Sequence, residues 1–149
     1  DIPRIKAIIN RLCAANGDVF PSPDQIAEMS VRQLDAIGCG YRSQYIRNSA
    51  EICAQTDILE RLRTAPTVDA QKLLMSLPGV GQKIADCVSL FVLGRFEVFP
   101  VDTWILKTLR VGKETESRLR ARLMETYGTN AGYAQQLIYY YNAILKAKG

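Results

Sequence analysis

The sequence predicts an all-α protein. Apolar residues recur three or four positions apart through most of the chain, and no segment shows the strong alternation that marks a half-buried strand. Serine or aspartate stands before several of these runs, as helix N-caps do. Glycine and proline separate the runs at short intervals. A chain of 149 residues is long enough for one core or for two small helical lobes.

The N-terminal residues form the first predicted helix. Isoleucine and leucine recur at helical spacing between residues 2 and 12, and Gly17 is expected to terminate the helix. Ser22-Pro23 then combines an N-cap with a first-turn proline, whose missing N–H costs nothing at that position. This pair predicts a short helix through Met29.

Four more helices are expected in the middle of the chain. A proline disfavours the helical conformation of the residue before it, so Pro66 must follow the end of one of them. In order, the helices are Ser30 to Gly38, about 41–56, Asp57 to the residue before Pro66, and Thr67 into the turn at 77–81.

The C-terminal half continues in the same way. Asp102 follows a short extended link, residues 98–100, and has the position of an N-cap. The expected helices are about Gln82 to Leu93, Asp102 to about Arg110, about Glu114 to Tyr127, and Ala131 to Lys146. All segments together amount to about eight to ten helices.

The composition is that of an ordinary globular domain. Hydrophobic residues make up 48% of the chain and charged residues 23%, and no apolar run is long enough to span a bilayer. The net charge of +4 gives a mild preference for polyanions. Because the chain opens on Asp1-Ile2-Pro3 without an initiator Met, we expect it to be an excerpt of a longer protein.

The absence of histidine restricts the chemistry of any active site. No Ser-His or Cys-His nucleophile can be assembled, so catalysis must use Lys, Asp, Glu, Tyr or Cys. The four cysteines form no CxxC pair, which argues against a zinc site or an iron–sulfur cluster. They are expected to be reduced thiols of an intracellular protein, three of them in the core. No metal site is therefore predicted.

The turn Leu77-Pro-Gly-Val-Gly81 joins two predicted helices. Glycine permits backbone angles closed to other residues, and Gly79 and Gly81 leave the amides unshielded at the start of the next helix. Such amides, together with the positive end of the helix dipole, can bind a phosphate oxygen. The alternative is a purely structural turn between packed helices.

Lys83 lies in the first turn of the helix that follows. The helix dipole disfavours an ammonium ion there, which would favour the free amine that a nucleophile requires. Cys87, four residues later, falls on the same face, and Asp102 supplies a carboxylate at the start of another helix. The alternatives are a surface lysine paired with Asp86, a core cysteine, and an aspartate that serves only as an N-cap.

These motifs resemble those of a known enzyme family. Residues 77–87, LPGVGQKIADC, followed by Val98-Phe-Pro-Val-Asp102, closely resemble the helix-hairpin-helix DNA glycosylases with a Gly/Pro-rich loop and an essential aspartate. Within that family the chain is most similar to the 8-oxoguanine DNA glycosylases. No cysteine follows Cys87, whereas the endonuclease III branch normally carries a four-cysteine iron–sulfur loop. The likeness covers nearly all of 1–149, with the hairpin at about 70–95, and includes Ile2-Pro-Arg-Ile5, Gly40-Tyr-Arg42 and Ala131-Gly-Tyr-Ala-Gln-Gln136.

The resemblance implies two helical lobes around a cleft. It also implies an enzyme that removes 8-oxoguanine from double-stranded DNA and cleaves the strand at the resulting abasic site. Lys83 matches the nucleophile that attacks C1′ of the damaged nucleoside, expels the base and forms a Schiff base. Asp102 matches the carboxylate that supports this chemistry. The pocket for the extruded base is implied at Cys87, Gln135 and Tyr139.

The same resemblance implies which residues hold the DNA. Arg4 and Arg42 match residues that face the opposite cytosine, and Tyr41 matches a ring that wedges into the distorted helix. The hairpin would bind the phosphate backbone through Gly79, Val80, Gly81 and Gln82. No cofactor is required, although a monovalent cation at the hairpin carbonyls fits the family pattern. We expect a monomer without membrane association, in the cytoplasm and nucleoid of a prokaryote or the nucleus of a eukaryote.

Two departures from the family pattern stand out. The β-rich N-terminal domain that many members carry is absent from this sequence, and Trp104 stands where the best-known eukaryotic members have a histidine near a phosphate. Two other functions stay open: the same chemistry on oxidised pyrimidines, and a non-catalytic DNA-binding module that uses only the hairpin. A binding module would require neither Lys83 nor Asp102 at these positions.

Overall fold

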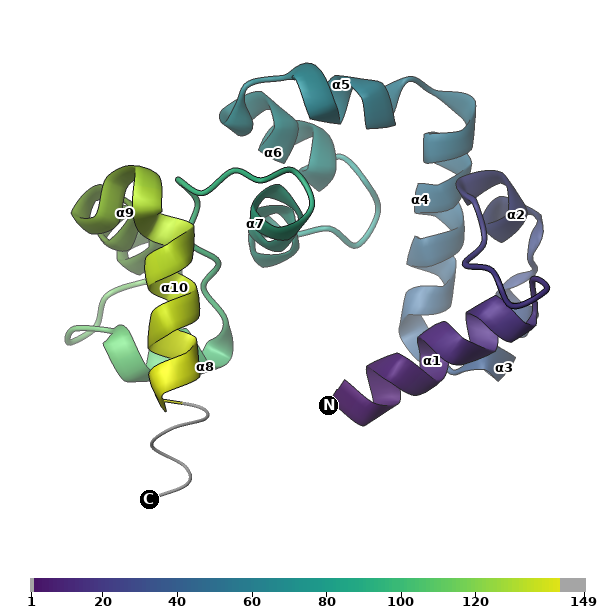
Figure 1. The fold of residues 1–149 in the computed structure, drawn as a ribbon, viewed down its shortest axis with the longest axis horizontal. Coiled ribbons are helices and arrows are strands. Elements are labelled where there is room, and N and C mark those ends of the chain that lie inside the picture. The colour runs from purple at the N-terminus through teal and green to yellow at the C-terminus, as the bar shows by residue number, and fades with distance from the viewer. Residues whose placement is uncertain (1, 143–149) are drawn as a thin grey trace. The chain divides into compact units, whose positions relative to one another are not determined.

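The protein is helical, as the sequence predicts. A computed structural model describes residues 2–142, which form ten α-helices and two 3-10 turns without any strand (Figure 1). The chain divides into two compact units. The first, called here the N-terminal unit, comprises Asp1–Thr64 and Ser76–Gly79; the second, the C-terminal unit, comprises Ala65–Met75 and Val80–Gly149.

The N-terminal unit contains five α-helices and a 3-10 turn. Leu34 and its neighbours at the end of α3 form the core of this unit with Leu12 of α1, and α2 packs against α4. The elements are α1 (Ile2–Ala14), α2 (Pro23–Glu28), α3 (Val31–Ile37), the turn Gly40–Arg42, α4 (Ser43–Gln55) and α5 (Ile58–Thr64).

Serine caps set the starts of α2 and α3 where the sequence predicts them. Ser22 accepts a hydrogen bond from the backbone N–H of Gln25, whose side chain accepts one from the Ser22 backbone. Ser30 and Gln33 form the same reciprocal capping box. Each box satisfies two backbone donors that a helix start otherwise leaves unpaired. Gly38, with φ of 105°, ends α3 in the left-handed conformation.

Two further expectations need correction, one for the N-terminal unit and one for the cysteines of the whole chain. The helix predicted over residues 41–56 begins as the 3-10 turn Gly40–Arg42 and becomes α-helical only at Ser43, whose hydroxyl donates to Gly40 O at 2.8 Å. Three core thiols were expected, but only Cys39 is buried, while the other three cysteines are partly exposed.

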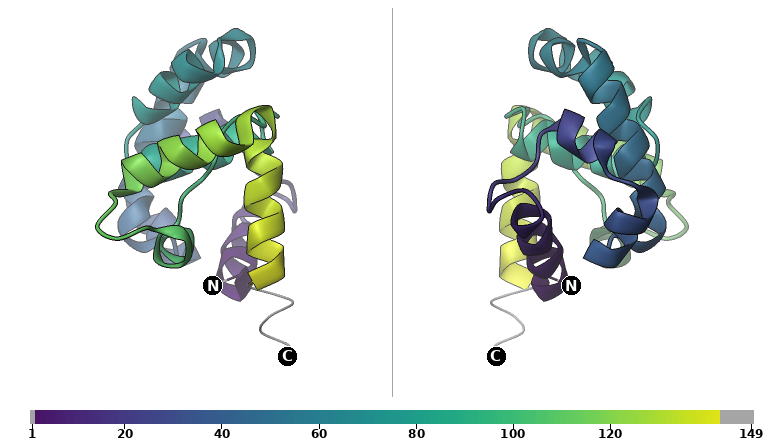
Figure 2. Two further views of the ribbon diagram at one scale, coloured as in Figure 1. Left: turned by 90° about the vertical axis from the view of Figure 1, so that its left-hand side faces the viewer. Right: turned by 90° about the vertical axis from the view of Figure 1, so that its right-hand side faces the viewer.

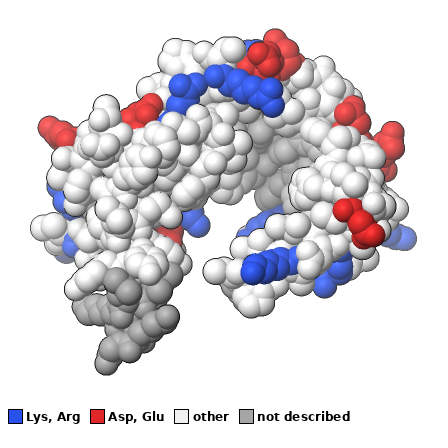
Figure 3. Space-filling view, viewed as in Figure 1, with Lys and Arg blue, Asp and Glu red and all other residues white. Residues whose placement is uncertain are grey.

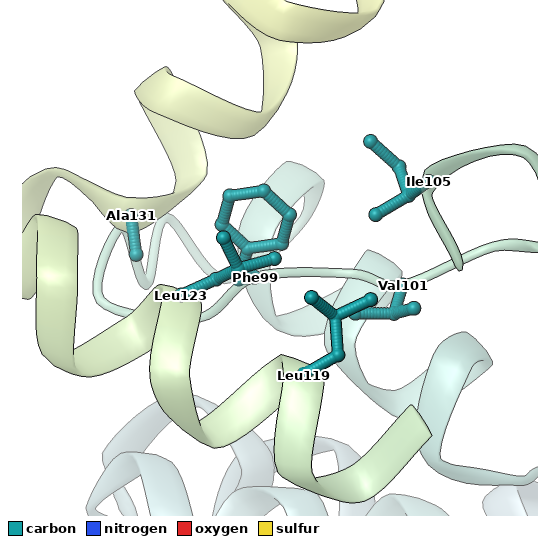
Figure 4. Close-up of a cluster of buried hydrophobic side chains, with 6 residues drawn as sticks. All are labelled: Phe99, Val101, Ile105, Leu119, Leu123 and Ala131. Atoms are coloured by element: carbon teal, nitrogen blue, oxygen red, sulfur yellow. The ribbon is translucent and has the colours of Figure 1, made fainter. Parts of the chain in front are cut away.

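The C-terminal unit contains α6 (Thr67–Met75), α7 (Gln82–Phe91), α8 (Thr103–Leu109), α9 (Glu116–Tyr127), the 3-10 turn Gly128–Asn130 and α10 (Ala131–Tyr140). Figure 2 shows α10 leaving the end of α9 at a steep angle. The extended link between α7 and α8 runs through the core, where the buried side chains are Phe99, Val101, Ile105, Leu119, Leu123 and Ala131 (Figure 4). Burial of this link fixes the position of the next residue, Asp102.

A close backbone approach brings α10 against the end of α7. The backbone N–H of Gly132 donates to Phe96 O at 2.7 Å, and a Cβ at position 132 would overlap the side chain of Leu90. A larger residue at position 132 would have to displace the Leu90 side chain and crowd Phe96 O, which glycine avoids. The contact lies one turn before Gln135, so it places that residue beside α7.

One boundary in the C-terminal unit differs from the expected one, and another cannot be compared with its expected position. α9 starts at Glu116 behind the N-cap Thr115, two residues later than predicted. Glu114 instead forms an ion pair with Arg122 at 3.0 Å. The last helix is α-helical to Tyr140, and its expected end at Lys146 lies outside the described residues. Within residues 2–142, no helix has the length and apolar character needed to cross a membrane.

Candidate active site

Lys83 and Cys87 lie on one side of α7, as their spacing predicts. Lys83 is exposed in the first turn, and Cys87 is partly buried one turn later. Burial raises the pKa of the Cys87 thiol; nearby Lys83 lowers it, and Asp86 and Asp102 raise it. The net direction is upward, so this side chain is held as a neutral thiol rather than a reactive thiolate.

A pocket of about 220 Å³ brings together the five residues predicted for catalysis and base binding. It opens between α7, the start of α8 and α10. Its lining consists of Lys83, Cys87, Phe91, Pro100, Asp102, Gln135, Gln136 and Tyr139. Sequence reasoning missed Phe91, although it continues the four-residue spacing of Lys83 and Cys87 along α7. It also missed Gln136, which follows Gln135 directly, and Pro100, two residues before Asp102.

Asp102 is both the N-cap of α8 and part of the pocket wall. Its backbone is extended, and its Oδ1 accepts a hydrogen bond from the backbone N–H of Ile105 at 2.7 Å. The predicted N-cap is thus confirmed. A carboxylate has about four acceptor directions, so one hydrogen bond leaves most of its capacity for the pocket.

Gln135 and Tyr139 reach the pocket from successive turns of α10. Gln135 is 6% exposed, and its Oε1 accepts a hydrogen bond from Gln136 Nε2 at 2.5 Å. The ring of Tyr139 meets Trp104 edge to face, with 5.8 Å between ring centroids and an interplanar angle of 78°. Trp104 therefore holds the Tyr139 ring from the side, an arrangement typical of aromatic pairs.

The suggested pairing of Lys83 with Asp86 is wrong. Asp86 is fully buried, and both of its carboxylate oxygens accept hydrogen bonds from Arg120, at 2.6 and 2.7 Å. Further hydrogen bonds come from Gln71 Nε2 at 2.6 Å and Gln82 Nε2 at 3.0 Å. The Gln82 side chain is therefore directed at Asp86, and only its backbone could take part in the predicted contact of the hairpin.

The two glycines of the hairpin differ in what the fold demands of them. Gly79 has φ of 78°, and a Cβ there would lie 2.7 Å from the ring of Tyr45. Conformation and packing both require glycine at this position. Gly81 has an ordinary φ of −101°, and a Cβ would meet no atom within 4 Å. Gly81 is the N-cap of α7, and it has no side chain to accept hydrogen bonds from the first-turn amides.

A cation at the hairpin would have to use backbone carbonyls. Two of them already accept hydrogen bonds, Pro78 O from Ser49 Oγ at 3.2 Å and Gly81 O from the Ala85 backbone N–H at 2.9 Å. No side chain of the turn sequence Leu77-Pro-Gly-Val-Gly81 supplies an oxygen ligand. The expected cation stays a prediction.

The predicted DNA-contacting residues of the N-terminal unit also lie together. Arg4 and Arg42 line one pocket of about 400 Å³. The Arg42 guanidinium lies 4.4 Å from the ring centroid of Tyr41, which is 75% exposed. In the space-filling view of Figure 3, lysine and arginine side chains lie along α1, which carries Arg4.

Comparison with known proteins gives consistent results. A family model described as "HhH-GPD superfamily base excision DNA repair protein" matches residues 2–128. The "Probable N-glycosylase/DNA lyase" of Methanothermobacter thermautotrophicus is 34% identical over 117 residues, which cover 76% of this chain and 38% of the relative.

Two solved structures share the fold. One is described as MBOgg1 in complex with a low-affinity DNA ligand, with a TM-score of 0.86 and 29% identity over 98% of this chain and 56% of that one. The other is the Clostridium acetobutylicum 8-oxoguanine glycosylase/lyase, in complex with double-stranded DNA containing cytosine opposite 8-oxoguanine. Its TM-score is 0.84, with 25% identity over 95% of this chain and 54% of that one. The chain thus spans between 38% and 56% of the length of these relatives.

Proposed function

Because the chain belongs to the HhH-GPD superfamily of base excision DNA repair proteins, we propose that it is a bifunctional DNA glycosylase and abasic-site lyase acting on 8-oxoguanine opposite cytosine. The predicted resemblance to this superfamily is confirmed. One observation carries the proposal: a primary amine, Lys83, and a carboxylate, Asp102, line the same small pocket as Gln135 and Tyr139. The activity would take place where the cell keeps its DNA, in a nucleoid or a nucleus.

The proposed reaction begins with the amine of Lys83. The Nζ lone pair forms a bond to C1′ of the damaged nucleoside as the C1′–base bond breaks and the base leaves with a proton. Opening of the sugar ring gives a Schiff base between Lys83 and C1′. Loss of a proton from C2′ then expels the 3′ phosphate, which cuts the strand. The carboxylate of Asp102 would stabilise positive charge developing on the sugar and assist the proton transfers.

The pocket would receive the base after its extrusion from the duplex. Extrusion is required because the reacting atoms cannot be reached inside the stack. Gln135 offers both donors and an acceptor to the polar edge of the base, and Tyr139 offers a ring face for stacking. Cys87, held as a neutral thiol, would contact the base without competing with Lys83 as a nucleophile. A polar contact is needed here, since 8-oxoguanine and guanine differ little in volume.

The N-terminal unit would act on the DNA around the lesion. Arg4 and Arg42 share a pocket and carry the donors needed to hold a cytosine left without its partner. Tyr41 is exposed, and Arg42 stacked over its ring reduces the freedom of both side chains. A ring so held suits the role of a wedge between bases, which offsets part of the cost of unstacking.

The hairpin would hold a phosphate through the backbone amides at the start of α7. A glycine at position 81 is demanded neither by its φ nor by packing, but it leaves these amides open to an anion. Such contacts position DNA without reading its sequence. A hairpin cation is not needed for any step of the proposed reaction.

A matched pair of glycine variants separates folding from phosphate binding. Gly79→Ala is expected to destabilise the protein by roughly 2–4 kcal/mol, because it combines a left-handed backbone with an overlap on Tyr45. Gly81→Ser is expected to raise stability by a few tenths of a kcal/mol through a new N-cap. The same variant should weaken binding to duplex DNA about tenfold, because the serine hydroxyl would accept a hydrogen bond from a backbone amide of α7 that the phosphate would otherwise use. Thermal melting and fluorescence anisotropy measure the two effects, and wild-type affinity in Gly81→Ser would contradict phosphate binding at this helix end.

Borohydride trapping tests the proposed function directly. The wild-type chain is incubated with duplexes carrying 8-oxoguanine opposite cytosine, thymine glycol opposite adenine, an abasic site, or no lesion. Borohydride reduces the Schiff base to a stable amine, so a reacting enzyme remains bound to DNA on a denaturing gel. We expect adducts with 8-oxoguanine and abasic DNA. Adducts with thymine glycol alone would shift the substrate to oxidised pyrimidines, and DNA binding without any adduct would indicate a binding module.

A further inference from the structure

The buried carboxylate of Asp86 has no place in the proposed reaction, yet it is the most heavily hydrogen-bonded side chain near the pocket. Arg120 binds both of its oxygens, through Nε at 2.6 Å and Nη2 at 2.7 Å. Gln71 and Gln82 add two more donors at 2.6 and 3.0 Å. Among residues 2–142, Asp86 is the one acidic or basic residue whose side chain is buried. Three of the four donors reach Oδ1 and one reaches Oδ2, so both carboxylate oxygens are hydrogen-bonded.

The donors come from three separate elements of the C-terminal unit. Gln71 belongs to α6, Arg120 to α9, and Gln82 is the first residue of α7 itself. Asp86 thereby ties the start of α7 to both neighbouring helices. A bidentate arginine fixes direction as well as distance, because its planar fork matches the two carboxylate oxygens.

The start of α7 needs such support because its N-cap is a glycine. A serine or aspartate cap normally holds the first turn, and Gly81 supplies no acceptor. The hydrogen bond from Gln82 to Asp86 spans one turn and holds the first residue of the helix from the side. Lys83 is the next residue, so the direction of its Cα–Cβ bond depends on the same turn.

We propose that Asp86 and Arg120, with Gln71 and Gln82, are positioning residues for Lys83. They allow the first turn of α7 to stay ordered while its amides remain open and its lysine is aimed into the pocket. The inference rests on the proposed function, because it concerns the step in which Lys83 attacks C1′. Displacement of a nucleophile by about 1 Å can slow a reaction by about 100-fold. The network should therefore affect the rate of the covalent step more than the affinity for DNA.

A purely structural role predicts a different outcome, and α9 supplies a matched control. Arg122, two residues after Arg120 on the same helix, also pairs with a carboxylate, Glu114, at 3.0 Å. The side chain of Arg122 donates hydrogen bonds to Glu114 and to Leu109 O, and neither residue belongs to α7. Arg122→Gln therefore removes an arginine–carboxylate pair from the same helix without releasing the start of α7.

The experiment measures three quantities for each variant. The rate of adduct formation is measured in single turnovers with saturating abasic DNA. The Kd for the same DNA is measured without borohydride, and the melting temperature of the protein is measured separately. Arg120→Gln should slow adduct formation about 10- to 100-fold and change the Kd by less than about twofold. Arg120→Lys, which keeps the charge but loses the fork, should be intermediate. Arg122→Gln should react within about twofold of wild type even where its melting temperature falls.

Gln82→Met provides a second test of the same network in case Arg120→Gln does not fold. Methionine preserves the length of the side chain and removes only the hydrogen bond to Asp86, and we expect adduct formation about fivefold slower. Two outcomes would overturn the positioning role. One is a wild-type rate of adduct formation in the folded variants. The other is a rate that falls only in proportion to the loss of stability in both Arg120→Gln and Arg122→Gln. A wild-type chain that traps no DNA would instead contradict the proposed function, so the two failures are distinguishable.

Discussion

Lys83→Gln is expected to abolish the trapped adduct with abasic DNA, with a loss of roughly 10³-fold or more. Glutamine is similar to lysine in length and remains polar, but its amide nitrogen has no available lone pair with which to attack C1′. Excision of 8-oxoguanine should be lost as well, because the same amine displaces the base. Gel analysis after borohydride reduction measures the adduct, and a duplex with 8-oxoguanine measures excision.

The control for this variant is Lys107→Gln in α8, which removes an exposed lysine outside the pocket lining. It should form adducts at the wild-type rate. Lys83→Gln should still bind abasic DNA, since the hairpin amides are unchanged. An undiminished adduct in Lys83→Gln would show that another amine carries the reaction, which would remove the main support for the proposed mechanism.

Asp102→Asn is expected to slow adduct formation roughly 100-fold or more while leaving the stability of the fold almost unchanged. Asparagine is as good an N-cap as aspartate, so its side-chain oxygen can still accept the hydrogen bond from the backbone N–H of Ile105. The substitution therefore removes the charge and keeps the cap. Single-turnover kinetics and thermal melting measure the two quantities separately.

Asp102→Ala completes the comparison, because it removes both the charge and the cap. Its loss of activity should equal that of Asp102→Asn, and it should also lose about 1 kcal/mol of stability. If Asp102→Asn were as active as wild type, the charge of Asp102 would not be needed for the reaction, and its role would be that of an N-cap alone. Both variants must be compared at a temperature well below either melting transition, so that partial unfolding does not contribute to the measured rate.

The starts of helices could be predicted because their signals are local. Ser22, Ser30 and Asp102 each form the cap that their sequence context indicates, with the acceptor and donor within three residues of each other. Glu114 was misplaced for the complementary reason. An acidic residue before a polar run favours a helix start, but its real partner is Arg122, eight residues later. Only the folded arrangement of α9 makes that pairing visible.

In the candidate site, too, local spacing could be predicted from the sequence, whereas contacts between distant elements could not. Four-residue spacing alone indicates that Lys83 and Cys87 share a face, and the same holds for Gln135 and Tyr139. That the two faces meet around one pocket followed from the family resemblance, because no local signal relates α7 to α10. The role of Trp104 behind Tyr139 was likewise unforeseen, since the two rings are 35 positions apart in sequence.

The alternative that paired Asp86 with Lys83 is wrong, and the sequence carried a signal against it. Its helical neighbours at positions 85, 89 and 90 are Ala, Ser and Leu, all of which are buried. A carboxylate among small and apolar residues on one helix face requires a buried partner, which a surface lysine at i−3 does not provide. The identity of that partner could not be deduced, because Arg120 is 34 positions away and Gln71 lies on another helix.

The glycine N-cap of α7 sets two selective pressures against each other. In a laboratory screen that rewards heat resistance alone, serine or aspartate at position 81 would be enriched, because the backbone there accepts any residue and nothing obstructs a side chain. The survivors of such a screen would have lost affinity for DNA. Attempts to engineer this protein for thermal robustness should therefore hold position 81 fixed and seek improvement elsewhere.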